Sequence, residues 1–306
     1  MQRYLISRVI QSIFLLGGVL VVVFFMIRLT GDPASLMVSR NASEEMREAF
    51  REKMGFNRPL YVQFSDYLYG VLQGDFGNSL HFKQPAREII LERLPATFQL
   101  ATIALLGAVI IAVPIGIIGG SNPGSFVDSL GRALGLLGQT IPNFWLALIL
   151  ILVFAVNLRW FPTFGRDSYL SVVLPAIALG LGSMGQLVRL TRSAVLEIRN
   201  DDYIRTAKSK GISQLKIGLR HIARNTSLVL ISVIGVIYSY LLGGSIYIEI
   251  IFSWPGLGSL LEQAIKSRDF PLVMGITITF SFFVIFINLL TDIAYAFIDP
   301  RIRYGG

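Results

Sequence analysis

The sequence predicts an all-α polytopic membrane protein with six transmembrane helices. Of its 306 residues, 53% are hydrophobic and 15% are charged, whereas soluble domains carry about 25% charged residues. The mean hydropathy is +0.63, and long apolar blocks such as Leu100–Ile118 and Val273–Leu290 recur along the chain. These blocks approach the roughly 20 helical residues that cross the hydrocarbon core of a bilayer.

Six segments satisfy this length rule. The first follows Arg3 and Arg8, as a signal peptide would, but its apolar run is too long and no Ala-x-Ala-like cleavage site follows. We therefore expect a retained helix. The predicted spans are Val9–Ile27, Ala96–Gly119, Leu134–Val156, Leu170–Val188, Leu228–Ile248 and Val273–Ala294.

The distribution of the 27 basic residues predicts the orientation. If the N-terminus is cytoplasmic, fourteen of them fall in inside segments, nine of these between Arg189 and Arg224, and four fall in the short outside loops. Cytoplasmic loops are enriched in Lys and Arg. Both termini are therefore expected in the cytoplasm, and the net charge of +8 needs no nucleic-acid partner.

The predicted outside segment Thr30–Pro95 has the charge content of a folded, hydrated subdomain. Asn41 and Ser43 are potential N-caps for a helix over Glu44–Met54, which has acidic residues early and basic residues late. A second amphipathic helix is predicted from apolar residues at helical spacing, namely Tyr61, Phe64, Tyr67, Leu68 and Val71. This subdomain either plugs the helix bundle or forms a platform for an external partner.

Small residues in the second and fourth spans predict close helix packing. Gly116 and Gly120 form a small-xxx-small pair beyond Pro114, which is expected to kink its helix. The fourth span is rich in Gly, Ala and Ser between Ala176 and Gly185. We attribute most of these positions to packing within the chain.

The sequence disfavours an enzyme. It has no cysteine, only two histidines (His81 and His221), no phosphate-binding loop and no H-E-x-x-H or G-x-S-x-G motif. Glu249 and Asp292 are the ionisable residues near span ends, where they are expected to reach water or a basic neighbour. Because an ion-coupled carrier usually needs more such groups near the midplane, that class is also disfavoured.

The connection between the fourth and fifth spans carries the most informative pattern. Asp201 and Asp202 begin a short predicted helix, Tyr203–Ser209, and Gly211 is suited to the left-handed position after it. Ser213 is expected to cap a second helix with Leu215, Leu219 and Ile222 on one side. Composition alone leaves two interpretations open: a basic loop with interfacial helices, or a docking helix.

The stretch Y-I-R-T-A-K-S-K-G at Tyr203–Gly211, followed by R-H-I-A-R-N at Arg220–Asn225, resembles the cytoplasmic "EAA" loop of ABC-importer permeases. It is most similar to the dipeptide/oligopeptide/nickel branch. Further matches in order are G-D-P-A at 31–34, G-D-F-G-N-S-L at 74–80, R-L-P-A-T at 93–97, E-I-I-F-S-W-P-G-L-G at 249–258 and D-P-R-I-R-Y at 299–304. The resemblance therefore covers nearly the whole chain.

This resemblance implies a type I ABC importer permease fold with a helical extracytoplasmic domain after the first helix. The implied domains are an N-terminal helix (1–29), the outer domain (30–95), a permease core (96–298) with a coupling loop at about 189–225, and a cytoplasmic tail (299–306). In the family, a coupling helix, here within 201–212, seats in a cytoplasmic ATPase. The implied contact residues are Asp202, Tyr203, Arg205, Thr206, Ala207, Lys208 and Gly211.

Two departures from the family pattern stand out. Arg205 occupies the position of the glutamate in the general EAA motif, as is usual for this branch. Thr226 and Ser227 follow R-H-I-A-R-N where the family commonly has a proline. The start of the fifth helix is therefore expected to be less kinked.

The W-P-G-L-G turn is expected outside the membrane, as a tight corner at the pore mouth. Pro255 fixes one dihedral angle, and Gly256 and Gly258 are expected to supply positive φ angles. With Glu249, Phe252 and Trp254, these residues form the predicted extracytoplasmic gate. A structural corner is favoured here over a direct ligand contact.

The resemblance implies one half of a heterodimeric pore in a bacterial or archaeal inner membrane. The implied partners are a second homologous permease, two ATPases that carry ATP and Mg, and an extracytoplasmic substrate-binding protein, with no cofactor or metal in this chain. The expected cargo is a di- or oligopeptide, glutathione included, with nickel chelates, opines and oligosaccharides as alternatives. The rival classes are an ion-coupled secondary transporter and a membrane scaffold.

Overall fold

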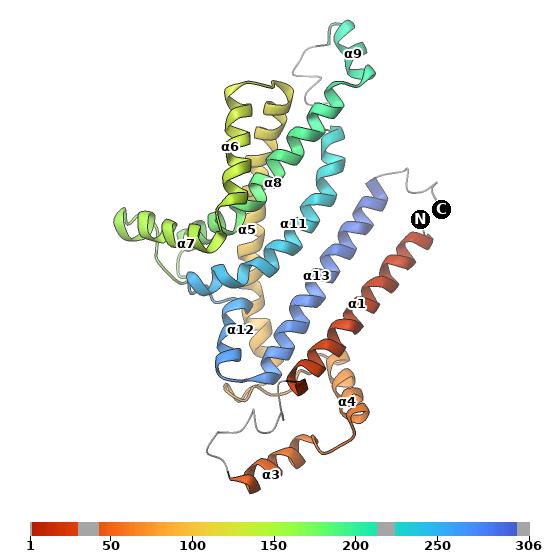
Figure 1. Ribbon diagram of the computed structural model, residues 1–306, viewed down its shortest axis with the longest axis vertical. Coiled ribbons are helices and arrows are strands. Elements are labelled where there is room, and N and C mark those ends of the chain that lie inside the picture. Colours follow the sequence, from red (N-terminus) through yellow and green to blue (C-terminus); the bar gives the residue numbers. More distant parts are fainter. Residues whose placement is uncertain (1, 30–42, 213–223, 299–306) are drawn as a thin grey trace.

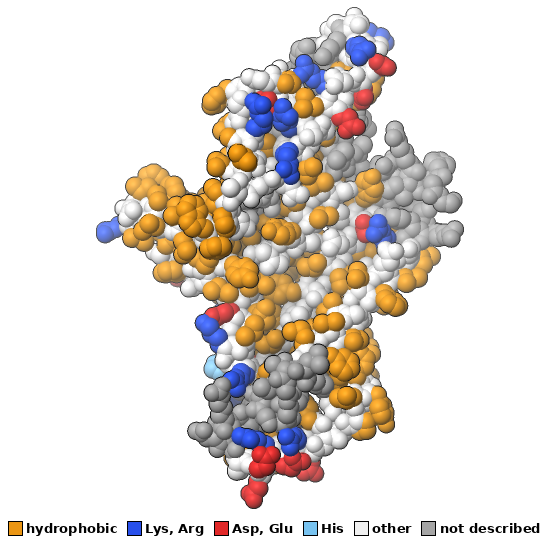
Figure 2. Space-filling model, in the orientation of Figure 1, with side chains coloured by type: hydrophobic (Ala, Val, Ile, Leu, Met, Phe, Trp, Pro, Cys, Tyr) orange, Lys and Arg blue, Asp and Glu red, His pale blue; other side chains and the backbone are white. Residues whose placement is uncertain are grey.

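The computed structural model describes residues 2–29, 43–212 and 224–298, and these are helical apart from short connections. Five helical segments are long and apolar enough to cross a membrane: Leu5–Met26, Ala86–Ser121, Tyr169–Arg199, Leu230–Ile251 and Phe270–Tyr295. They belong to α1 (Gln2–Leu29), α5 (Ala86–Ser121), α8 (Val173–Arg199) with the short 3₁₀ turn Tyr169–Val172 before it, α11 (Arg224–Ile251) and α13 (Phe270–Ile298). Figure 2 shows apolar side chains over the middle of the bundle and charged ones gathered mainly toward its two ends.

The third predicted span is broken, which corrects the expectation of one helix over Leu134–Val156. α6 (Phe126–Thr140) and α7 (Asn143–Leu150), which continues as a π-helix to Asn157, meet at 104°. Pro142 has no N–H group and disfavours a helical conformation in the residue before it. Ile141 accordingly adopts extended angles, φ −86° and ψ 119°.

The core lies where α5 and α8 run side by side, with α6 and α11 against them (Figure 1). Small residues allow this approach: a Cβ at Gly180 would lie 2.9 Å from the Ala104 carbonyl oxygen, and one at Gly185 would lie 2.9 Å from that of Leu134. The glycine pair behaves alike, since Gly116 faces Thr191 and Gly120 faces Val195. The predicted packing role of these glycines is confirmed.

α5 begins at Ala86, inside the segment assigned to the outer domain, and continues through Pro95 and Pro114. Its first turns are helical because Ile89 and Ile90 bury their side chains against the short helix α12 (Leu257–Lys266) and the start of α13. The boundary expected at residue 96 therefore divides a continuous helix. Burial of these early turns, rather than membrane-length hydropathy, sets the start of α5.

The first outer helix has the predicted bounds, and the second contains the apolar residues that predicted it. α3 (Glu44–Met54) is capped by Ser43, whose hydroxyl accepts a hydrogen bond from the Met46 amide, and it ends at Gly55 with φ 70°. α4 (Leu60–Leu72) packs on the end of α1 through Phe24, Phe64 and Tyr67. Figure 1 shows α4 beside the end of α1 and α3 beyond the end of the bundle, so neither helix lies among the membrane-length helices as a plug would.

α1 lies at the edge of the bundle against α13 (Figure 1). Arg8 and Asp292 form an ion pair of 3.4 Å between them. Asp292 thus has the basic neighbour that its position near a span end predicts. The beginning of α1 and the end of α13 lie close together, on the same side of the α12 end as α9 (Asp202–Ser209) (Figure 1).

Candidate functional site

The sequence-predicted residues form two groups, one at α9 and one at the corner between α11 and α12 (Figure 1). The structure does not bring the two groups together.

Ile204 anchors α9 to the bundle. Its side chain is fully buried against Val195 of α8, and Ile117, Ile198 and Ile212 pack around the pair. The neighbouring side chains of Tyr203, Arg205 and Thr206 remain exposed. α9 therefore presents a polar surface outward from a firmly held backbone.

The exposed side of α9 has mixed charge. Arg205 and Asp202 form an exposed i,i+3 ion pair of 3.5 Å, which contributes little to stability at such exposure. Gly211, after the helix, has φ 76°, the left-handed angle that its sequence position predicts. The side chains of Ala207 and Lys208 lie outside the described residues, as does the second predicted helix with Ser213, Leu215, Leu219 and Ile222.

A buried ion pair behind α9 was missed by sequence reasoning. Asp128, near the start of α6, is buried and accepts hydrogen bonds from Arg192 of α8 at 2.5 Å (Nε) and 3.3 Å (Nη2). The Gly124 amide donates to the same carboxylate at 2.9 Å, and the Ser125 hydroxyl caps α6. This pair ties α8 to α6 a few residues before α8 leads into α9.

Steric contact adds to this connection. A Cβ on Gly120 of α5 would lie 2.7 Å from the Cβ of Val195, the residue that contacts Ile204. The ends of α5, α6 and α8 therefore form one packed unit with α9. Such a unit is suited to moving as a rigid body.

The second group centres on Glu249, at the end of α11, whose side chain is completely buried. One carboxylate oxygen accepts hydrogen bonds from the hydroxyls of Thr97 (2.8 Å) and Ser245 (3.0 Å). The other accepts from the backbone amides of Gly258 (2.6 Å) and Ser259 (3.3 Å). Glu249 thus joins α5, α11 and α12, and the expectation that it reaches water or a basic neighbour is wrong.

The corner itself is fixed by an indole. Trp254 is buried and donates its Nε1–H to the Ala96 carbonyl at 2.8 Å, while Phe252 is buried beside it. The guanidinium of Arg166 lies 5.7 Å from the centre of the Trp254 ring, within cation–π range. The Thr97 hydroxyl also accepts from the Leu257 amide at 2.8 Å.

The predicted role of the corner glycines is wrong in its mechanism. Gly256 has φ −104°, Gly258 lies inside α12, and the positive φ of the corner belongs to Ser253, at 49°. A Cβ on Gly256 would collide with the Glu249 carboxylate, and one on Gly258 would lie 2.5 Å from Ile246 Cα. Gly256 is therefore explained by the buried carboxylate and Gly258 by its close approach to α11, not by turn geometry. Pro255 lies between Trp254 and the start of α12.

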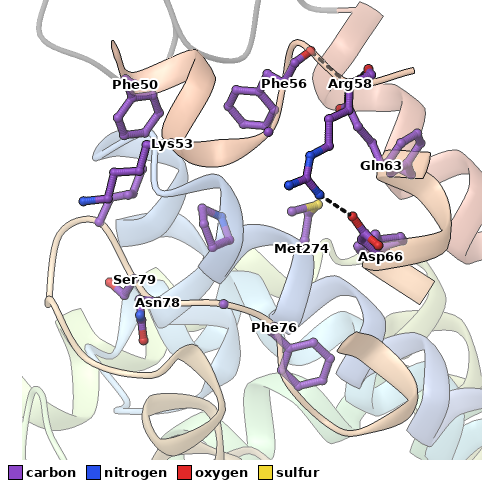
Figure 3. Close-up of a pocket in the computed structure, with 16 residues that line it drawn as sticks. Phe50, Lys53, Phe56, Arg58, Gln63, Asp66, Phe76, Asn78, Ser79 and Met274 are labelled. Carbon is purple, nitrogen blue, oxygen red and sulfur yellow. Dashed lines mark hydrogen bonds and ion pairs between the residues drawn. The ribbon is translucent and has the colours of Figure 1, made fainter. Parts of the chain in front are cut away.

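A cavity of about 730 Å³ lies between the outer helices and the segment that leads to α5. Figure 3 shows the rings of Phe50, Phe56 and Phe76 around it, with Arg58 pointing toward Asp66, 3.3 Å away. At its floor, the Ser79 hydroxyl donates to the buried Asp269 carboxylate before α13. The cavity is thus amphipathic and lies at the α12 end.

The described residues contain no group of three or more His, Asp or Glu side chains arranged to hold a metal ion. The α9 group is an exposed helix held by a buried isoleucine, and the Glu249 group is a buried hydrogen-bond network.

Two family descriptions match almost the whole sequence. Residues 112–304 match "Binding-protein-dependent transport system inner membrane component", and residues 1–101 match the N-terminal part of the same kind of membrane component.

Several curated proteins are similar over their full length. The chain is 39% identical to the oligopeptide transport system permease protein AppB of Bacillus subtilis, covering 99% of this chain and 100% of that protein. A putative peptide transport system permease protein of Brucella abortus is also 39% identical, with the same coverage. The glutathione transport system permease protein GsiC of Salmonella typhimurium is 37% identical, again over 99% and 100%.

A solved structure supports the fold. A chain of the MetNI methionine ABC transporter, crystallised in an inward-facing conformation, matches with a TM-score of 0.56 at 17% identity. The match covers 69% of this chain and 96% of that chain.

Proposed function

Because this chain belongs to the family of binding-protein-dependent transport system inner membrane components, we propose that it forms half of the translocation pathway of an ATP-driven importer for di- or oligopeptides, glutathione included. The observation that carries this proposal is full-length similarity, at 37–39% identity, to permeases named for oligopeptides, peptides and glutathione. The chain is a multi-pass inner-membrane permease subunit. Its own role in transport is conformational rather than catalytic.

The α9 surface is the proposed contact with a cytoplasmic ATPase. Tyr203, Arg205 and Thr206 are exposed there, while Ile204 holds the helix to α8. A short helix that is anchored on one side and polar on the other is suited to transmitting a displacement to α8 without unfolding. The ion pair of Asp128 with Arg192 then carries the displacement into α6.

This assignment fixes the proposed orientation. α9 and the ends of α1 and α13 that carry the chain termini lie on one side (Figure 1), which we place in the cytoplasm. Basic residues are concentrated in the segment around α9, in agreement with the enrichment of Lys and Arg in cytoplasmic loops. The α12 corner, the outer helices and the cavity of Figure 3 then face the extracytoplasmic side, where a substrate-binding protein is proposed to dock.

The proposed assembly contains a second, homologous permease and two ATPases. ATP and Mg are proposed to bind to the ATPases and not to this chain, in which no Gly-Lys pair of a phosphate-binding loop occurs. Chemical energy therefore enters the permease as motion of α9. The hydrogen-bond network of Glu249 is proposed to keep the extracytoplasmic corner intact during that motion.

Purification of the tagged chain from its native membrane, with mass spectrometry of co-purifying proteins, tests the proposal. The expected result is a second permease and at least one ATPase, with peptide uptake into proteoliposomes that requires ATP and the binding protein. Uptake that needs an ion gradient and no ATPase would show a secondary carrier. The same assembly with a nickel chelate, opine or oligosaccharide as its cargo would retain the transporter class and correct the cargo.

A further inference from the structure

A row of polar side chains is exposed on α8, the most buried of the apolar helices. In the span that contains α8, 72% of the apolar window is buried, against 17–33% in the other four unbroken spans. Between Val173 and Ser193 the exposed residues are Ile177, Gln186, Arg189 and Ser193. The three polar residues are three and four positions apart, so they share one face of the helix.

Arg189 lies toward the α9 end of the span that contains α8, at the predicted boundary of the membrane. The span Tyr169–Arg199 has 31 residues and its midpoint at Met184. At a rise of about 1.5 Å per residue the span is about 46 Å long, longer than the roughly 30 Å of a hydrocarbon core, and Val188, the predicted end of the fourth span, places Arg189 at the edge of that core. Contact between a guanidinium and the hydrocarbon is costly, so the group faces protein or a water-filled space.

Among the described residues, the charge of Arg189 is oriented but not neutralised. Its Nη1 donates to Oε1 of Gln139 on α6 at 2.9 Å, and Gln139 is itself exposed. In the part of the chain that the structure describes, no carboxylate forms a salt bridge with Arg189. The guanidinium is thus held in place by a neutral amide, with its charge available to an anion.

The break between α6 and α7 adjoins this position. Gln139 lies two residues before Ile141, where α6 ends. Interrupted helices at membrane depth occur where the backbone is buried in protein or lines a water-filled cavity. Asn143 at the start of α7 lies close by, since its Oδ1 would be 3.7 Å from a Cβ on Gly182 of α8. The polar face of α8 and the break therefore form one polar region.

We propose that Arg189, oriented by Gln139, binds the carboxylate of the peptide cargo in the wall of the translocation pathway, an inference that rests on the proposed function. Every peptide with a free C-terminus carries a carboxylate, and a guanidinium offers it paired donors in a planar geometry. Gln186 and Ser193 flank the charge with neutral hydrogen-bonding groups suited to peptide amides. A carboxylate of the partner permease and a lipid headgroup are the competing occupants.

Transport of matched peptides tests the charge. The assembled complex in proteoliposomes is given three tripeptides: one with neutral side chains and a free C-terminus, its C-terminal amide, and an amide that carries one glutamate. Arg189→Gln is expected to lower uptake of the free acid about tenfold and to leave the neutral amide unchanged, whereas Arg189→Lys retains most uptake. Arg159→Gln, at an exposed arginine outside the polar region, is the matched control.

The outcomes separate the carboxylate sources and the competing explanations. A loss for the free acid alone assigns the C-terminal carboxylate, and a loss for the glutamate-bearing amide as well assigns carboxylates in general. An equal loss for all three peptides, or no loss for any, overturns the inference. A wild-type complex that takes up none of them contradicts the proposed function instead.

Water accessibility gives a second, independent readout. Because the chain has no cysteine, Arg189→Cys introduces one thiol, and a charged thiol reagent applied to the assembled complex is detected by the mass of this chain. Modification at this position is expected, with none in Leu187→Cys, whose position is fully buried. Protection in Arg189→Cys would show that lipid or the partner permease covers the position, and would overturn the inference.

Discussion

Removal of the Glu249 side chain should destabilise the α12 corner far more than its neutralisation. In Glu249→Ala, the backbone amides of Gly258 and Ser259 lose their acceptor in a buried site. An unsatisfied buried donor costs about 1–3 kcal/mol, so the two together cost about 2–6 kcal/mol. In Glu249→Gln, the amide oxygen accepts from the same backbone groups and the NH₂ group donates to the hydroxyls of Thr97 and Ser245, so about 1 kcal/mol is lost.

Trp254 reports on this corner directly because it is buried and bonded to Ala96. Replacement of the exposed Trp145 and Trp160 by Phe leaves Trp254 as the single indole. Thermal unfolding of the purified protein, followed by tryptophan emission, should show a large fall in midpoint for Glu249→Ala and a small one for Glu249→Gln.

The control is Glu262→Ala, whose partly exposed side chain forms an i,i+4 pair with the exposed Lys266 on the same helix α12, and which should change the midpoint little. Equal midpoints for the alanine and glutamine variants of Glu249 would refute the reasoning. So would a wild-type midpoint for both.

Three further predictions concern the α9 end. Arg192→Gln leaves the buried Asp128 carboxylate without its main partner and should cost about 3–5 kcal/mol, whereas the double variant with Asp128→Asn should recover part of that loss; additive losses in thermal unfolding would contradict the pairing. Gly211→Val forces a β-branched residue to φ 76°, so ATP hydrolysis should continue while peptide uptake falls; full transport-linked hydrolysis would contradict this. Arg205→Glu reverses an exposed charge on α9 and should reduce co-purification of the ATPase without lowering the unfolding temperature; unchanged recovery and uptake would count against the contact.

Local signals in the sequence predict the local structure correctly. The bounds of α3 follow from its capping residue and its charge gradient, and the left-handed Gly211 follows from its place after a short helix. Five of the six spans follow from length and hydropathy alone. Each of these features depends on neighbours in the chain.

The errors occur where residues far apart in the chain meet. Asp128 and Arg192 are 64 positions apart, and neither has a local pattern that predicts the other. Gly256 is explained by the Glu249 carboxylate and Gly258 by close contact with Ile246 of α11. Glu249 in turn is held by Thr97, 152 positions earlier in the chain. Pro142 alone does not predict the broken span, because Pro95 and Pro114 lie inside a continuous helix and the presence of a proline does not separate the two cases.

Site-specific cross-linking tests the central claim, that α9 contacts an ATPase, most directly. A single cysteine introduced by Thr206→Cys, at an exposed position of α9, is compared in native membranes with Ser65→Cys, at an exposed position of the outer helix α4. We predict that Thr206→Cys forms a cross-link to the ATPase that changes in yield when ATP is added, and that Ser65→Cys forms none. A complex that transports peptide while Thr206→Cys forms no cross-link, or in which Ser65→Cys does, would contradict this claim.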